Sequence, residues 1–241
     1  MTKPNQITKT ITYRKVIDLS HVIHPQIPRW PGDPEVTFSA HADLATDGFY
    51  LRQVTIGEHS ATHINAPNTF DPQGASIDTY SADSLVVSAV VIDLRDRTAT
   101  NPDYQFTIAD IHAWEAQHQL IPAQSIVLLH TGWQAKWDDP ISFLNQDTAG
   151  TLHFPGFSGE ATEFLLEQRA IAGVGSDAHG VDPGNDQHFT ANQLVLKHGG
   201  LVLENLTNLD QLPAQGATLA IGILRFQSGS GSPVSVLAFV P

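Results

Sequence analysis

The amino-acid sequence predicts a single α/β domain with a mixed sheet and two or three covering helices. Short β-branched or apolar segments alternate with helical segments that begin at capping residues, which is typical of helices packed on a sheet. The segment 85–94 is almost continuously apolar, as expected for a buried central strand. No internal repeat and no linker divides the 241 residues, a length that one domain commonly reaches.

The composition is that of an ordered globular protein. Apolar residues make up 41% and charged residues 15%, and the formal net charge of −13 opposes binding to nucleic acid or an anionic membrane. Cysteine is absent, so any metal must be held by His, Asp, Glu, Asn or water. The sequence has no apolar run long enough to span a membrane, and the polar stretch 1–14 lacks the apolar region of a secretory signal. We therefore expect a cytoplasmic protein.

The N-terminal elements are an arm, a strand and a rigid loop. Residues 1–15 are expected to form a flexible arm, and the β-branched segment 16–23 follows as a first strand. Prolines and a Gly-Asp pair predict a rigid loop over 25–34, with Trp30 in its middle. A loop tryptophan is more often a packing residue than a ligand-binding one, and both roles stay open for Trp30.

Two strands, 36–40 and 49–56, are expected after this loop. On the second strand Tyr50, Val54 and Ile56 share one face, while the other face is polar and leads toward His59. The remaining predicted strands are 85–94, 125–131, 171–174, 201–205, 217–225 and 234–240.

Three segments combine a capping residue with a helical pattern. They are about 108–119 after Thr107, about 159–168 after Ser158, and about 191–198, where Thr190 and Gln193 match the capping-box pattern. Gly199-Gly200 is the expected end of the last helix.

One pair of histidines has a spacing suited to a metal or substrate site. Among 12 histidines, only His59 and His63 are four residues apart. In an extended chain His59, Ala61, His63 and Asn65 would all point to one side, and in a helix the two histidines would share a face. A single such pair also arises by chance in a histidine-rich sequence, so the surrounding residues decide its meaning.

Those residues resemble the signature of the cyclase family, metal-dependent hydrolases that include bacterial kynurenine formamidase and isatin hydrolase. The family pattern is His-x-Gly-Thr-His-x-Asp-Ala-Pro-x-His-Phe. The chain matches it at six positions: His59, Thr62, His63, Ala66, Pro67 and Phe70. It departs at three, with Ala61 for Gly, Asn65 for Asp and Thr69 for His.

The resemblance continues along the chain from about Asp18 to its end. Similar segments are Asp18–His21, Pro31–Pro34, Thr131–Trp133, Phe154–Gly156, Glu204–Leu206 and Gly231–Val234. The resemblance implies that residues 16–241 form one cyclase-like domain of the swivelling β/β/α type, and that the protein is a homodimer or homotetramer. A small-molecule substrate is the other expected partner.

Family members hold one or two divalent ions, and the resemblance indicates which ligands this chain keeps. The first ion lies on the signature histidines and Asp, and the second uses a His twelve residues before a Glu. Glu204 matches that Glu, but Asn192 stands where the His is expected. The lost carboxylate and imidazole argue against two ions. We expect one zinc or manganese ion at most, on His59, His63 and Glu204, with Asn65 a weak fourth ligand, or no ion.

The proton-transfer residue is the open question, because a threonine hydroxyl cannot replace a histidine near neutral pH. The resemblance places the loops of His179, His188 and His153 toward the pocket, although a loop histidine is more often a surface residue. Asp177 and Asp182 flank His179 and could orient it. The candidate catalytic positions are His179, His188 and Thr69, and the candidate substrate contacts are Trp30, Phe70, Asn65 and Asn192.

The sequence is compatible with two functions. The resemblance implies an arylformamidase-like hydrolase that cleaves an amide or lactone bond in a small, aromatic substrate. In an amide, the bond cleaved would be a carbon–nitrogen bond other than a peptide bond. The alternative is a metal-free descendant that binds a small molecule or performs non-hydrolytic chemistry.

Overall fold

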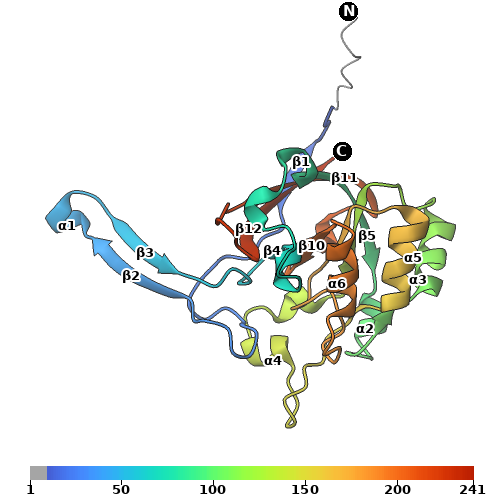
Figure 1. The fold of residues 1–241 in the computed structure, drawn as a ribbon, viewed down its shortest axis with the longest axis horizontal. Helices are drawn as coiled ribbons and strands as arrows, with labels where there is room; N and C mark the ends of the chain where they lie inside the picture. Colours follow the sequence, from blue (N-terminus) through green and yellow to red (C-terminus); the bar gives the residue numbers. More distant parts are fainter. Residues whose placement is uncertain (1–9) are drawn as a thin grey trace, which may run out of the picture.

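The computed structural model describes residues 10–241, which are built around a sheet of eight strands (Figure 1). Seven strands close into a barrel in the order β12-β11-β5-β7-β9-β10-β4, because β4 pairs with both β10 and β12. The strands are β1 (Lys15–Asp18), β4 (His63–Asn65), β5 (Val86–Asp93), β7 (Ser125–His130), β9 (Gly173–Ser176), β10 (Leu201–Glu204), β11 (Gln215–Ile223) and β12 (Gly231–Val240). β1 is the eighth strand and lies beside β12.

The sheet is mixed, as the sequence predicts. β5, β7, β9 and β10 are parallel neighbours, and the other pairings in this sheet are antiparallel. The apolar segment 85–94 forms β5, between β11 and β7. Because neighbouring parallel strands end at the same edge, the residues after β7, β9 and β10 come together at one end of the barrel.

The strands alternate between two apolar layers. On β7, Ile126 and Leu128 belong to the cluster inside the barrel, whereas Val127 and Leu129 pack with the helices outside it. The covering helices are α3 (Ile108–Gln117), α5 (Gly159–Arg169) and α6 (Thr190–Lys197), as predicted (Figure 1). Burial on both faces explains why the central strands read as nearly continuous apolar segments.

Two predicted helix caps are confirmed. The Thr107 hydroxyl accepts a hydrogen bond from the Asp110 amide, and the Asp110 carboxylate accepts one from the Thr107 amide. The Ser158 hydroxyl accepts one from the Ala161 amide. These side chains satisfy amide groups that have no partner within the first turn of a helix.

The predicted capping box at Thr190 is wrong. Phe189 precedes α6 with φ 51°, and the first amides of the helix donate to carboxylates instead. Asp182 accepts from the Ala191 and Asn192 amides, and Asp186 accepts from the Thr190 amide. A carboxylate is a stronger acceptor than a threonine hydroxyl, so the two aspartates replace the predicted cap.

The first strand is shorter than predicted. It ends at Asp18 rather than Ile23, because the Asp18 carboxylate accepts the Ser20 amide and turns the chain. Of the arm predicted for residues 1–15, residues 1–9 lie outside the described part of the chain. The Arg14 amide already donates to the Val240 carbonyl at 2.8 Å, beside β12.

A two-stranded hairpin extends away from the barrel (Figure 1). It consists of β2 (Thr37–Ala42), the one-turn helix α1 (Leu44–Asp47) and β3 (Leu51–Thr55), and all residues of β3 are exposed. On the predicted apolar face, Tyr50 and Val54 are 63% and 50% exposed, and only Ile56, at the base of the hairpin, packs against the core.

Shorter elements complete the fold. They are α2 (Arg95–Thr98), β6 (Gln105–Phe106), α4 (Pro140–Leu144), β8 (Gly156–Phe157) and the 3-10 turns η1 (Pro67–Thr69), η2 (Ile77–Thr79), η3 (Ala82–Leu85), η4 (Trp133–Lys136) and η5 (Leu209–Gln211). Among the described helices, none combines the length and apolar character needed to cross a membrane.

Gly173 offers a test of the close approach between β9 and β10. A Cβ at this position would lie 2.2 Å from the Leu201 carbonyl oxygen, so Gly173→Ala must displace backbone in the centre of the sheet. We predict a loss of about 1–3 kcal/mol or more in the free energy of unfolding, measured by urea denaturation. Gly222→Ala is the matched control, because its nearest contact would be an ordinary 3.4 Å. Equal effects of the two substitutions would contradict this packing.

Candidate active site

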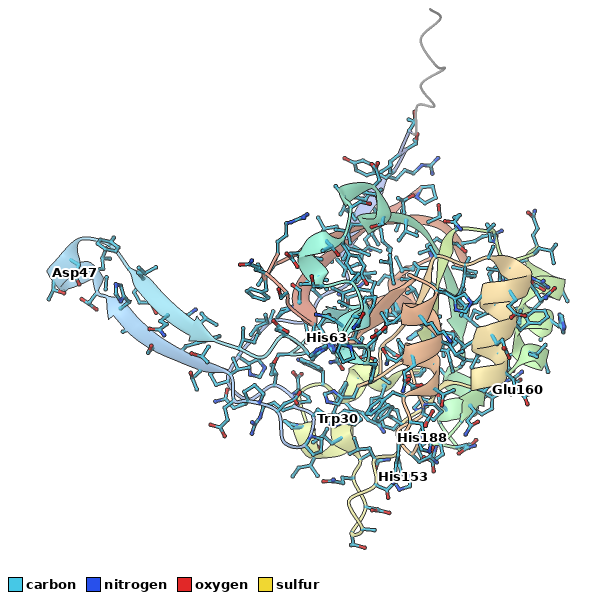
Figure 2. All side chains as sticks on the ribbon, viewed as in Figure 1. Trp30, Asp47, His63, His153, Glu160 and His188 are labelled. Atoms are coloured by element: carbon cyan, nitrogen blue, oxygen red, sulfur yellow. The ribbon has the colours of Figure 1, made fainter. Side chains whose placement is uncertain are left out.

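A cavity of about 220 Å³ lies where β9 and β10 end and the antiparallel strand β4 begins. His63 and Glu204 contribute from β4 and β10, and His179 comes from the loop after β9. Trp30 reaches the same cavity from the N-terminal loop, and Figure 2 shows Trp30 and His63 near the middle of the molecule, far from Asp47 at the hairpin tip. The position agrees with the tendency of ligands to bind at the carboxyl ends of parallel strands.

One wall of this pocket is aromatic. The Trp30 ring lies 6.3 Å from Phe154 and 5.9 Å from Phe189, and Phe189 lies 5.5 Å from Phe70, all between ring centroids. The four rings form a continuous surface that a flat apolar ligand can contact. The predicted substrate contacts Trp30 and Phe70 are therefore brought together in one wall.

The histidine motif is not one extended strand. Ala61 has φ 54°, so the chain turns there and only His63–Asn65 forms the strand β4. The predicted alignment of His59, Ala61, His63 and Asn65 along an extended chain is wrong for this reason. A left-handed conformation favours glycine, which explains why the family pattern has Gly where this chain has Ala61.

His63 is fixed by both ring nitrogens. Its Nδ1 donates to the Ala61 carbonyl at 2.9 Å, and its Nε2 lies 2.9 Å from the Glu204 carboxylate. Both side chains are buried. Burial alone would raise the pKa of Glu204, but hydrogen bonds from His63 and Asn192 and the charge of His63 lower this pKa to about 2. Glu204 is therefore ionised at neutral pH.

His59 lies between Asn65 and Ser230. Its Nδ1 is 2.8 Å from Asn65 Oδ1, and its Nε2 is 2.9 Å from Ser230 Oγ. The Ser230 hydroxyl also donates to Glu58, a carboxylate that the sequence reading did not include. Burial and the nearby His63 lower the pKa of His59, partly opposed by Asn65, Glu204 and Asp33.

Two asparagines connect the histidine motif to α6. Asn65 Nδ2 donates to Asn192 Oδ1 at 2.9 Å, and Asn192 Nδ2 donates to both Glu204 and Asp182. Carboxylates only accept, so the orientation of both amides is fixed by this chain of bonds. These are the positions where the family has Asp and His, and both predicted contacts line the pocket.

Asp182 is a buried carboxyl in the same wall. Burial raises its pKa to about 7, although hydrogen bonds from Asn192 and the Ala191 amide act in the other direction. Neither Asp182 nor Asp177 is hydrogen-bonded to His179. Asp177 accepts instead from the Thr131 and Gly132 amides, so it shapes the loop after β7.

His179 lines this pocket, and one of its two ring nitrogens is buried without a hydrogen-bond partner. Its ring stacks on Trp30 with centroids 5.4 Å apart, and its Nδ1 is 3.2 Å from Asn205 Oδ1. Asn205 uses its Nδ2 to donate to the Ala61 carbonyl, so Oδ1 accepts from His179 and Nε2 is left as an acceptor in the neutral ring. Burial lowers the pKa of His179 to about 4, and Nε2 has no partner among the described residues.

The other predicted proton-transfer residues are placed differently. Thr69 lines the pocket, but its hydroxyl donates to the Ser230 carbonyl. His188 is exposed and does not line this cavity; it lies beside the hollow next to α6 (Figure 2). His153 is held by Asp103 and Asp147, whose hydrogen bonds raise its pKa, and it too lies outside the cavity.

Several lining residues were not identified from the sequence as site residues. They are Asp33, Phe154, Gly180, Pro183, Asp186 and Phe189. The similarity of Pro31–Pro34 to the family was the available signal for Asp33. Burial raises the pKa of Asp33, while the nearby charges of His59 and His63 lower it.

The donor set fits one divalent ion better than two. His63 Nε2 and Glu204 Oε2 are in hydrogen-bond contact at 2.9 Å, so the two donors face one another and could both bind one ion placed between them. His59 lines the same pocket but bonds Asn65 and Ser230, so it would have to release one of them. Within residues 10–241, no group of three or more His, Asp or Glu side chains is already arranged to bind a metal ion.

Comparison with known proteins shows the family to which the sequence and fold are similar. Residues 17–183 match the family model described as putative cyclase. An isatin hydrolase from Roseibium aggregatum is 35% identical, covering 94% of this chain and 92% of the relative. A kynurenine formamidase from Erythrobacter litoralis is 27% identical, covering 83% and 82%. The crystal structure of an isatin hydrolase bound to the product analogue thioisatinate superposes with a TM-score of 0.89, at 34% identity over 94% of this chain and 92% of the other.

The pKa of Asp182 predicts a pH dependence of stability. The pKa of Asp182 is about 7 in the folded chain and the ordinary value for an aspartate is 3.8, so the folded state holds this proton more tightly. The resulting stabilisation is complete below pH 3.8 and is lost as the pH rises through 7. Asp182→Asn cannot ionise, so the unfolding free energy of the parent should fall by about 2–3 kcal/mol relative to this variant between pH 5 and 8.

Urea denaturation at several pH values measures this difference. Asp96→Asn removes an exposed carboxylate on α2 and serves as the control for loss of one charge. If the difference in unfolding free energy between the parent and Asp182→Asn stays constant from about pH 5 to 8, the raised pKa of Asp182 is contradicted.

Proposed function

This chain belongs to the cyclase family, and from that membership we propose that it hydrolyses an amide bond in a small aromatic substrate. The bond is a carbon–nitrogen bond other than a peptide bond, as the names of the isatin hydrolase and kynurenine formamidase relatives suggest. The relatives are matched over most of their length, which supports carrying the type of reaction to this chain.

The observation that carries this proposal is that an aromatic wall and a polar, charged wall line the same small cavity. The aromatic wall of Trp30, Phe70, Phe154 and Phe189 faces the buried contact between His63 and Glu204. A ring bound on the first wall can present an attached amide to the second. Binding of the ring then orients the reacting carbonyl, which lowers the entropy cost of the reaction.

We propose one divalent ion at most, zinc or manganese, on His63 and Glu204 with His59 as third donor. Two histidines, one glutamate and a water form a known catalytic zinc set. When bound, such an ion would acidify a water molecule and polarise the substrate carbonyl. Asn65 and Asn192 contribute no charge, and their hydrogen bonds hold His59 and Glu204 in position.

His179 is the proposed proton acceptor. Of the three candidate catalytic positions, it alone both lines the cavity and has a ring nitrogen without a hydrogen-bond partner among the described residues. Its low pKa keeps it neutral, so it can accept a proton or hydrogen bond but is a weak base. Thr69 is committed to the Ser230 carbonyl and supports that loop.

A metal-free descendant remains the second proposal, and one observation favours it. His59, Asn65, Asn192, Glu204 and His63 already satisfy one another through an unbroken chain of hydrogen bonds. Such a network can be stable without an ion between its members.

Hydrolysis of isatin and of N-formylkynurenine tests the proposed function. Assays with the purified protein, with and without added zinc or manganese, should show turnover of at least one of these aryl amides. Glu204→Gln should lower kcat/KM by about 100-fold or more, because it removes the charge on the reacting wall. His179→Gln should lower it by about 10²–10⁴-fold, the usual effect of a lost proton-transfer group.

Asp96→Asn, outside the cavity, is the control variant for these assays. Absence of turnover under all conditions, in protein that is folded by circular dichroism, would refute hydrolysis of these amides. Full activity in Glu204→Gln would refute the assignment of the site.

A further inference from the structure

The loop that carries Trp30 also places a carboxylate in the cavity. The Asp33 amide donates to the Trp30 carbonyl at 3.0 Å, across Pro31 and Gly32. Gly32 has φ 97°, a value that suits glycine at the third position of a type II turn, and proline suits the second. The indole and the carboxylate are therefore held on one rigid turn, and both line the pocket.

The Asp33 carboxylate has no hydrogen-bond or ion-pair partner in residues 10–241. The nearest cation in sequence, Arg29, donates one nitrogen to the Asp33 backbone carbonyl and directs another toward Glu35. The carboxylate is half-buried, so leaving it without a partner costs free energy that a ligand can recover.

A second, independent group in the cavity also lacks a partner. His179 is 5% exposed, and its Nε2 is buried without a hydrogen bond. The bond between its Nδ1 and Asn205 leaves Nε2 as an acceptor. The two unpartnered polar groups, which line the same cavity as Trp30, therefore both call for a ligand that donates hydrogen bonds.

The charge of the cavity favours the same kind of ligand. Asp33, Asp182, Asp186 and Glu204 line it, and none of its described lining residues is lysine or arginine. Glu204 is paired with His63, and burial raises the pKa of Asp182 to about 7. Near neutral pH the negative charge therefore rests mainly on Asp33 and Asp186. A carboxylate on the ligand would be repelled by these groups. An ammonium group would be attracted to them and to the face of a tryptophan, the aromatic side chain that binds cations best.

We propose that the turn Trp30–Asp33 is a subsite for a protonated amine, so that the preferred substrate is an aromatic amide carrying an ammonium group. The Asp33 carboxylate and the Trp30 ring hold the ammonium, and His179 Nε2 accepts a hydrogen bond from an N–H of the ligand. The substrate class rests on the proposed hydrolysis, whereas the amine subsite stands on the pocket alone.

Binding of three small probes of similar size tests the subsite without any hydrolysis. Benzylamine is a cation at pH 7, benzyl alcohol is neutral and benzoate is an anion. Calorimetric titration, with and without a chelator, should give a dissociation constant for benzylamine at least about tenfold lower than for benzyl alcohol, with benzoate the weakest. Equal binding of benzylamine and benzyl alcohol, tighter binding of benzoate, or no binding of benzylamine would each overturn the proposal.

Asp33→Asn separates the carboxylate from the general charge of the protein. Asparagine keeps the size of the side chain, so the turn should remain, and a thermal unfolding curve checks this. The variant should lose the tenfold preference for benzylamine, whereas Asp96→Asn, which changes the net charge equally, should keep it. Retention of the preference in Asp33→Asn would overturn the role of this carboxylate.

The substrate class is tested with three formanilides. We expect kcat/KM to decrease by about tenfold or more from the 4-aminomethyl compound to formanilide, and again to the 4-carboxylate. If none is hydrolysed while benzylamine binds through Asp33, the proposed hydrolysis of these amides fails and the amine subsite stands. If the 4-carboxylate is the best substrate, the proposed substrate class is wrong and the hydrolysis stands.

Discussion

The buried charge of Glu204 is the constraint on which the rest of the site depends. A carboxylate in this position would be strongly destabilising without partners, because burial removes its hydration. His63 supplies the contact at Oε2, and Asn192 and the Val181 amide donate to Oε1. The strand β10 that carries Glu204, the strand β4 that carries His63 and the helix α6 that carries Asn192 must therefore stay in register around one side chain.

The direction of the hydrogen bonds follows from that charge. Asn192 must donate to Glu204, so its oxygen faces Asn65, and Asn65 in turn offers its oxygen to His59. Asp and His at these two positions would bring ionisable metal ligands, but the two amides bring neutral, oriented dipoles. The substitutions thus keep the positions of His59, His63 and Glu204 while removing the charge that a second divalent ion would require.

The parts of this structure that could be predicted from the sequence are those set by local chemistry. Periodicity located the strands, and Thr107 and Ser158 marked the starts of helices because their side chains cap the next turn. Thr190 is not the cap because Asp182 accepts hydrogen bonds from the first amides of α6. Asp182 reaches these amides only when its loop folds back onto the start of the helix. Such competition between residues apart in sequence leaves no local pattern.

The candidate site shows the same division. The family motif placed Trp30, His59, His63 and Glu204 in one cavity, and they do line one. The left-handed turn at Ala61 could not be inferred from the sequence, because alanine rarely adopts this conformation. The glycine that the family pattern has at this position would have indicated the turn. His188 was placed by its loop alone, and the direction of a loop side chain depends on tertiary contacts.

Metal content of the purified protein, measured by elemental analysis before any chelator is added, tests the central claim most directly. One buried glutamate with two neutral amides should hold no more than one divalent ion per chain, even after incubation with excess zinc or manganese. A value of zero to one after removal of free metal agrees with this account, and zero favours the metal-free alternative. Two tightly bound ions per chain would contradict it.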